Sequence, residues 1–343
     1  RVPVTRESDV FGRARELGML RGAWDAARHG EGRTVLVEGE AGVGKTRVVD
    51  AFVLELEQQH VRTLYGSYPP EGTQNGLTTA VLDHLGHADL EGHLAPYFQG
   101  ADALAQAFAA ALRREVGTDG EAPLSGDSFT AALIRLARGL ATERPVLWIV
   151  EDLHNAAPAA RSRILAMARA LENVPALLLL TTRPDAIEQE LPELSRLEGF
   201  HRLVVPRLDE VALQKLTDAL FLDPGVAERV GPLLASKTDG IPFFVFELLR
   251  GLCESGRLRR RSDGRYEELT PFDEIEAPST VRDLVRTRLS ELSSDERHLI
   301  DVAAVQGHAF DPDLQARVLQ APRVGVLQTL AHLERRGGLV RSK

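Results

Sequence analysis

Short apolar runs alternate with segments of helical periodicity up to about residue 206. Apolar positions three or four residues apart predict a first helix over residues 14–29, with a face formed by Leu17, Leu20, Trp24 and Ala27. Strands are predicted at the compact apolar runs 34–37, 61–65, 146–150, 176–182 and 201–205. Helices are predicted between them at 47–58, 101–115, 128–142 and 158–171. Strands separated by helices predict an α/β domain with a parallel sheet over residues 1–206.

Helical patterns dominate the chain after residue 206. Asp209 is the expected N-cap of the first of three helices, and Pro232 and Pro242 are expected to limit the other two. These helices are predicted at 208–221, 225–236 and 241–255. A small hairpin is predicted at 257–266, around Ser262-Asp263-Gly264. We therefore expect a helical lid domain over residues 207–278.

The last part of the chain predicts a winged helix. Helices are expected at 279–292, 295–306, 311–319 and 325–337. A pair of glycines and a strand-like segment at 339–341 follow, and helices that close on a glycine and a β edge are typical of this domain. We expect a winged-helix domain over residues 279–343. The chain starts at an arginine and stops just after an apolar pair, so we expect it to be a piece of a larger protein, truncated within this domain.

The segment between the first predicted strand and the next helix carries the phosphate-binding pattern G-x-x-x-x-G-K-[ST]. It reads Gly39-Glu40-Ala41-Gly42-Val43-Gly44-Lys45-Thr46, followed by Arg47. The glycines allow consecutive backbone N–H groups to point at phosphate oxygens, and the helix N-terminus adds a positive dipole end. Lys45, one of four lysines in an arginine-rich chain, is expected to reach the β- and γ-phosphates, and Thr46 to bind Mg²⁺.

Composition and charge narrow the classes of function. A hydrophobic content of 43% and a charged content of 27% are ordinary for a soluble globular protein. The net charge of −9 gives no overall attraction to nucleic acid or anionic membranes. Cys253 is the single cysteine, which excludes an internal disulfide and suits a reducing cytoplasm. No apolar run approaches the ~18 residues of a membrane span, so we expect no membrane contact.

Two adjacent carboxylates follow the apolar run at residues 146–150. Glu151 and Asp152 would stand at the carboxyl end of a buried strand, where ligands collect in such sheets. We assign Glu151 to the metal, largely through water, and Asp152 to orienting the attacking water, although the reverse roles are possible. His154 follows as either a γ-phosphate sensor or an ordinary loop histidine.

Two sets of arginines have different interpretations. Arg183 follows the strand predicted at 176–182, and an arginine there can reach the γ-phosphate and distinguish ATP from ADP. The cluster Arg257, Arg259, Arg260, Arg261 and Arg265 has acidic residues close by and one aromatic neighbour. A solvated hairpin is therefore favoured over a nucleic-acid contact for this cluster.

Together these motifs resemble the STAND class of AAA+-related signalling NTPases. The likeness is strongest to the ATPase modules of large ATP-binding LuxR-type regulators and of cyclase- or kinase-fused bacterial regulators. It rests on the segments at 10–17, 37–47, 148–154, 180–184, 240–244 and 282 onward. The chain has Glu151-Asp152 where the family usually has two aspartates, and Asn155 where it usually has tryptophan.

The resemblance implies further binding residues and a mode of action. It places Val10 and Arg13 near the adenine, packs Pro242 on the base, and makes Arg183 a sensor. His298 and His308 are the candidates for a winged-helix contact with the β-phosphate. The family is built as a P-loop domain followed by helical and winged-helix domains, with the nucleotide between them. It implies a switch held compact by ADP and released by ATP, with slow Mg²⁺-dependent hydrolysis, homo-oligomers in the ATP state and fused effector domains as partners.

Two alternatives remain open. One is a DNA-acting AAA+ ATPase of the origin-initiator type, which also pairs this core with a winged helix. The mixed charges of residues 279–343 argue against direct DNA binding, because no basic stripe is present. The other is a scaffold locked on its nucleotide without turnover.

Overall fold

The computed structural model describes residues 10–59, 61–69, 76–114, 124–184, 192–271, 286, 289–290, 292–307, 310–337 and 340. The chain divides into two compact units. The sheet unit comprises Arg13–Gly39 and Lys45–Val205. The helical unit comprises Pro206–Lys343 together with Arg1–Gly12 and the loop Glu40–Gly44. Each unit is described by itself below.

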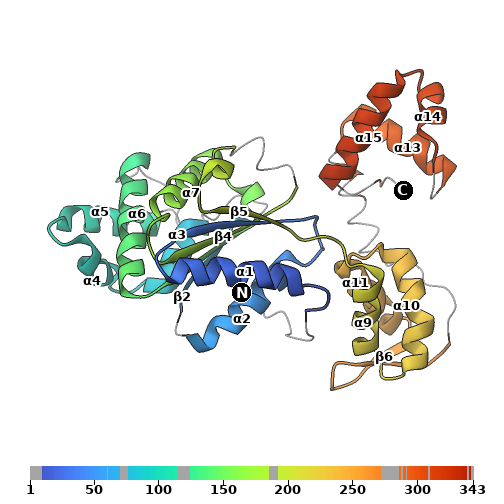
Figure 1. The fold of residues 1–343 in the computed structure, drawn as a ribbon, viewed down its shortest axis with the longest axis horizontal. Helices are drawn as coiled ribbons and strands as arrows, with labels where there is room; N and C mark the ends of the chain where they lie inside the picture. The colour runs from blue at the N-terminus through green and yellow to red at the C-terminus, as the bar shows by residue number, and fades with distance from the viewer. Residues whose placement is uncertain are drawn as a thin grey trace. The chain divides into compact units, whose positions relative to one another are not determined.

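The sheet unit is built on five parallel strands in the order β2-β3-β4-β1-β5 (Figure 1). The strands are β1 Arg33–Glu38, β2 Arg62–Ser67, β3 Val146–Glu151, β4 Ala176–Thr182 and β5 Phe200–Val204. All five expected strands are therefore present, and the predicted α/β domain with a parallel sheet is confirmed. Because the strands are parallel, the carboxyl ends of β1, β3 and β4 meet at one edge of the sheet.

Helices cover both faces of this sheet, which explains why its strands are apolar throughout. The helices of this unit are α1 Ala14–Arg28, α2 Lys45–Leu56, α3 Gly76–Leu85, α4 Leu90–Leu94, α5 Asp102–Arg114, α6 Gly126–Glu143 and α7 Pro158–Ala170. Leu36, Trp148 and Leu178 join the core beneath α3 to α7. The alternate positions Val35 and Leu179 are also buried, on the face against which α1 packs. Figure 1 shows α1 and α2 on one side of the sheet and α6 and α7 on the other.

The helical unit begins with three helices around a shared apolar core. They are α9 Glu210–Leu220, α10 Pro224–Thr238 and α11 Pro242–Glu254. The Asp209 side chain accepts a hydrogen bond of 2.7 Å from the Ala212 N–H, as expected of an N-cap. The expected hairpin is present as β6 Leu258–Arg260 and β7 Tyr266–Glu268, and Arg259 pairs with Glu267 across it at 2.7 Å.

One prediction in this unit is wrong, because Pro232 lies inside α10 and does not end it. Proline removes one backbone hydrogen bond and costs a helix interior roughly 3 kcal/mol. Val230 and Leu234, on either side of it, are fully buried in the core of this unit. Burial of side chains of this size contributes about 1.5–3 kcal/mol each, which outweighs the loss. Pro242 does mark a boundary, since it stands at the first turn of α11.

Three further helices pack around Leu299, Leu330 and Leu333. They are α13 Ser294–Gln306, α14 Pro312–Val318 and α15 Arg323–Gly337. Most of the helix expected at 279–292 lies outside the described residues, as do His308 and the strand-like end at 339–341 apart from Val340. The winged helix and the three domain boundaries therefore stay predictions. In the part of the chain that the structure describes, no helix has the length and apolarity needed to cross a bilayer.

Candidate functional site

The predicted phosphate-binding segment forms the turn between β1 and α2. Gly42 and Gly44 have φ values of 84° and 96°, in the left-handed region that favours glycine. The helix α2 begins directly at Lys45, so the N–H groups of its first turn belong to this turn. The Lys45 side chain is only 9% exposed, and its Nζ donates a hydrogen bond of 2.8 Å to the Gly39 carbonyl. The ammonium is thus held against the turn on which phosphates are expected.

Glu151 ends β3 and is 4% exposed. Its Oε2 accepts a hydrogen bond from the Tyr65 hydroxyl of β2. Its Oε1 is buried and has no hydrogen-bond partner among the described residues. Burial raises the pKa of this carboxyl group, while the Tyr65 and Thr46 hydroxyls act in the opposite direction. A buried carboxylate with one unpartnered oxygen, close to the hydroxyl of Thr46, suits a hard divalent cation.

The oxygen atoms of Thr46 and Glu151 suit Mg²⁺ better than a metal ion whose ligands all come from protein side chains. Among the described residues, no three His, Cys, Asp or Glu side chains form a group that could hold a metal ion. Mg²⁺ commonly uses one or two protein ligands and completes its coordination with water and substrate phosphates. Thr46 and Glu151 are therefore sufficient as the protein part of such a site.

Asp152 directly follows Glu151 and has an unusual backbone conformation. Its φ of 56° is left-handed, and its N–H donates to the Thr181 hydroxyl at 3.0 Å. Left-handed non-glycine residues are uncommon and cluster at functional sites. Burial raises the pKa of Asp152, while the positive charges of Lys45 and Arg183 act to lower it. The loop between β3 and α7 thus presents this carboxylate to both cations.

His154 lies in a short 3-10 helix just beyond Asp152. Its pKa is lowered to about 4, first by burial and then by the charges of Arg183, Lys45 and Arg161. The ring is therefore neutral at physiological pH. Its Nδ1 is buried without a partner among the described residues, as is the hydroxyl of Thr182 at the end of β4. Buried polar atoms of this kind usually have a partner, and beside several cations an anion would supply one.

The structure thus brings together most of the predicted residues of the sheet unit at the carboxyl edge of its strands. The members of this group are Gly39, Lys45, Thr46, Glu151, Asp152 and Arg183. Arg13, expected near the adenine, is 3% exposed and lies 3.7 Å from Glu16. Arg47 lies half-buried in the first turn of α2. These positions assign no ligand by themselves.

The remaining predicted residues belong to the helical unit. Glu40, Ala41, Gly42, Val43 and Gly44 are grouped with it, and the Gly42 carbonyl accepts a hydrogen bond of 3.2 Å from the Phe243 N–H, next to Pro242. Val10 is half-buried. His298 is exposed on α13.

Sequence reasoning missed several side chains of the site. The Thr181-Thr182 pair could have been found, because two polar residues end a run of leucines just before Arg183. Tyr65 has no such signal. Its contact depends on the pairing of β2 with β3, in which Ser67 aligns with Glu151.

Comparison with known proteins gives a family. A family model described as an AAA ATPase domain matches residues 9–180. An uncharacterized protein of Rhizobium meliloti (strain 1021) is 23% identical over 321 residues, which cover 87% of this chain. The chain spans about 30% of the length of that relative.

Several solved structures are similar at low identity. The Aeropyrum pernix ORC1 protein, solved in complex with DNA, has a TM-score of 0.48 at 16% identity and covers 97% of this chain and 85% of its own. The Pyrococcus horikoshii STAND protein PH0952, with a tetratricopeptide repeat sensor, has a TM-score of 0.39 at 15% identity and covers 95% and 39%. Drosophila ORC bound to DNA has a TM-score of 0.44 at 10% identity and covers 99% and 78%.

Proposed function

Because this chain belongs to the AAA ATPase domain family, we propose that it binds ATP and ADP at residues 39–46 and acts as a nucleotide-controlled switch with slow ATP hydrolysis. The observation that carries the proposal is the group at the edge of the sheet. A buried ammonium, a buried carboxylate with an unpartnered oxygen, and further cations all lie there. This combination suits a triphosphate with its metal.

Each side chain has a role that its position supports. Lys45 and the N–H groups at the start of α2 would bind the phosphates. Thr46 and Glu151 would hold Mg²⁺, which, when bound, neutralises charge on the β- and γ-phosphates. Asp152, held by Thr181, would orient the attacking water, and Arg183 would stabilise the γ-phosphate charge. The neutral His154 ring would accept or donate one hydrogen bond without adding charge.

Slow turnover is part of the proposal, because hydrolysis would serve such a switch as its timer. A switch needs a nucleotide that binds its two conformational states with different affinities. To reverse their populations from about 1:99 to 99:1, the binding free energies for the two states must differ by about 5.5 kcal/mol. Pro242 at the start of α11, next to a residue bonded to the loop, and Val10 are proposed as contacts with the base. We further propose that the switch controls output domains outside this chain and permits self-association with ATP.

Binding and turnover test this function separately. We expect wild-type protein to bind labelled ATP and ADP with Mg²⁺ and to release phosphate over minutes to hours. Lys45→Ala should lose binding at least tenfold, whereas Glu151→Gln should keep binding and lose phosphate release. Arg229→Ala removes an exposed ion pair with Glu268 in the helical unit and is the matched control. Equal binding by wild type and Lys45→Ala would refute the site, and binding without release would leave a nucleotide-locked scaffold.

A further inference from the structure

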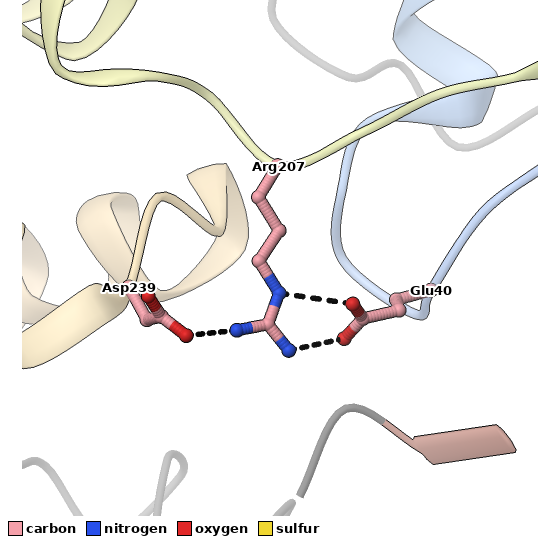
Figure 2. Close-up of polar contacts among 3 residues, drawn as sticks. All are labelled: Glu40, Arg207 and Asp239. Carbon is pink, nitrogen blue, oxygen red and sulfur yellow. Dashed lines mark hydrogen bonds and ion pairs between the residues drawn. The ribbon is translucent and has the colours of Figure 1, made fainter. Parts of the chain in front are cut away.

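One side chain of the phosphate-binding segment is held by an arginine from a distant part of the sequence. Arg207 donates two parallel hydrogen bonds to the Glu40 carboxylate, from Nε at 2.9 Å and from Nη2 at 2.8 Å. Its Nη1 forms an ion pair with Asp239 (Figure 2). Arg207 and Glu40 are 15% and 20% exposed, so the pair is largely shielded from water. Two-pronged pairs of this kind fix orientation as well as charge.

Glu40 is an unfavourable residue for its position. It is the second residue of a segment whose predicted ligand is a triphosphate, and a carboxylate repels such a ligand. At a separation of about 8 Å and an effective dielectric constant of about 20, one unit charge shifts binding more than tenfold. Arg207 supplies the compensating charge. Burial disfavours that charge, but the hydrogen bonds and charges of Glu40 and Asp239 outweigh it and raise the pKa of Arg207.

The backbone around Arg207 is also fixed. The N–H of the next residue, Leu208, donates to the Gly240 carbonyl at 2.8 Å. Gly240 has a φ of 72°, and a Cβ on it would lie 2.2 Å from the Leu208 carbonyl oxygen. The loop Glu40–Gly44, which Arg207 contacts at Glu40, has a second contact at Gly42. The Phe243 N–H donates a hydrogen bond of 3.2 Å to the Gly42 carbonyl. Both attachments of the loop, at Glu40 and at Gly42, therefore come from segments joined through Gly240.

We propose that Arg207 is a positioning residue for nucleotide binding, which cancels the charge of Glu40 and turns its carboxylate away from the phosphates. The inference rests on the proposed binding of nucleotide at residues 39–46. The ligand in question is a nucleoside triphosphate with Mg²⁺. ADP carries less negative charge than ATP, so the Glu40 carboxylate repels it less. Removal of Arg207 should consequently weaken ATP binding more than ADP binding.

A double-mutant cycle tests this role. Calorimetric titration with Mg-ATP and Mg-ADP would compare wild type, Arg207→Ala, Glu40→Gln and the double variant. We expect Arg207→Ala to bind ATP about tenfold more weakly and ADP less than fivefold more weakly. Glu40→Gln should bind ATP a few-fold more tightly, because it leaves the Arg207 charge uncompensated by Glu40. The double variant should return to within about threefold of wild type.

The controls separate charge from structure. Arg229→Ala removes another arginine–glutamate pair of the same unit and should bind as wild type does. Raising the salt from about 0.05 M to 0.5 M should shrink the Arg207→Ala defect, because screening weakens repulsion. A double variant as weak as Arg207→Ala, or an equal loss for ATP and ADP, would overturn the inference. If wild type itself binds neither nucleotide, the proposed function fails; if only the cycle fails, the proposed function stands.

Discussion

The half-buried, neutral His154 should make the sheet unit lose stability in mild acid. Its folded pKa of about 4 lies below the ordinary value of 6.5 because of burial and the charges of Arg183, Lys45 and Arg161. At a pH between these two pKa values, His154 is protonated in the unfolded chain and neutral in the folded protein. The free energy of unfolding therefore falls as the pH is lowered through this range. Replacing His154 by a residue that does not titrate should abolish this contribution to the fall.

The size of the effect follows from the two pKa values. Lowering the pH from 7 to 5 would cost about 2 kcal/mol if the full difference applied. The ring is not fully buried and water screens the neighbouring charges, so about 1 kcal/mol is the expected loss. His154→Gln keeps a polar group without a titratable ring, and its loss over the same interval should be smaller by that amount.

Tryptophan fluorescence is the appropriate assay. Both tryptophans, Trp24 and Trp148, are buried in the sheet unit, so urea unfolding followed by their emission reports this unit alone. Nucleotide-free wild type, His154→Gln and His201→Gln would be unfolded at pH 7 and pH 5. His201 is exposed on β5 and serves as the control. If His154→Gln and wild type lose the same free energy of unfolding, the reasoning about the buried ring is refuted.

Two further predictions concern single contacts. Tyr65→Phe should lower the stability of the sheet unit by about 1–3 kcal/mol at pH 7, because it removes a hydrogen bond to a buried carboxylate. The loss should be smaller at pH 5, where Glu151 is more protonated. Urea unfolding at the two pH values checks this, and a larger loss at pH 5 would contradict it. Gly240→Ala should lower the stability of the helical unit by at least about 2 kcal/mol, whereas Gly256→Ala, with a similar φ of 70° and open space around its Cβ, should cost about 1 kcal/mol; thermal unfolding would show equal shifts if the clash with Leu208 were unimportant.

The fold of the sheet unit was readable from the sequence because burial on both faces makes its strands uniformly apolar. Residues 146–150 and 177–180 are fully or almost fully buried, and they are the clearest apolar runs of the chain. The turn at residues 39–46 was predictable because Gly42 and Gly44 adopt left-handed φ values that favour glycine. Pro232 shows the opposite case, since the local rule for proline was overridden by packing that sequence periodicity does not reveal.

The missed residues depend on contacts between distant segments. Tyr65 reaches Glu151 only because β2 pairs with β3, and the strand order is not encoded in the spacing of apolar residues. Arg207 reaches Glu40 across 167 positions of sequence and is one of many arginines in the chain. No local pattern distinguishes it. Long-range partners of this kind require the tertiary structure.

A crystal structure with Mg²⁺ and ADP or a non-hydrolysable ATP analogue tests the central claim most directly. We expect the β-phosphate to lie against the backbone N–H groups of residues 42–46, with Lys45 Nζ released from the Gly39 carbonyl to contact it and Mg²⁺ beside Thr46 and Glu151. A loop that stays closed by its own side chains, with the nucleotide bound elsewhere or absent, would contradict the account.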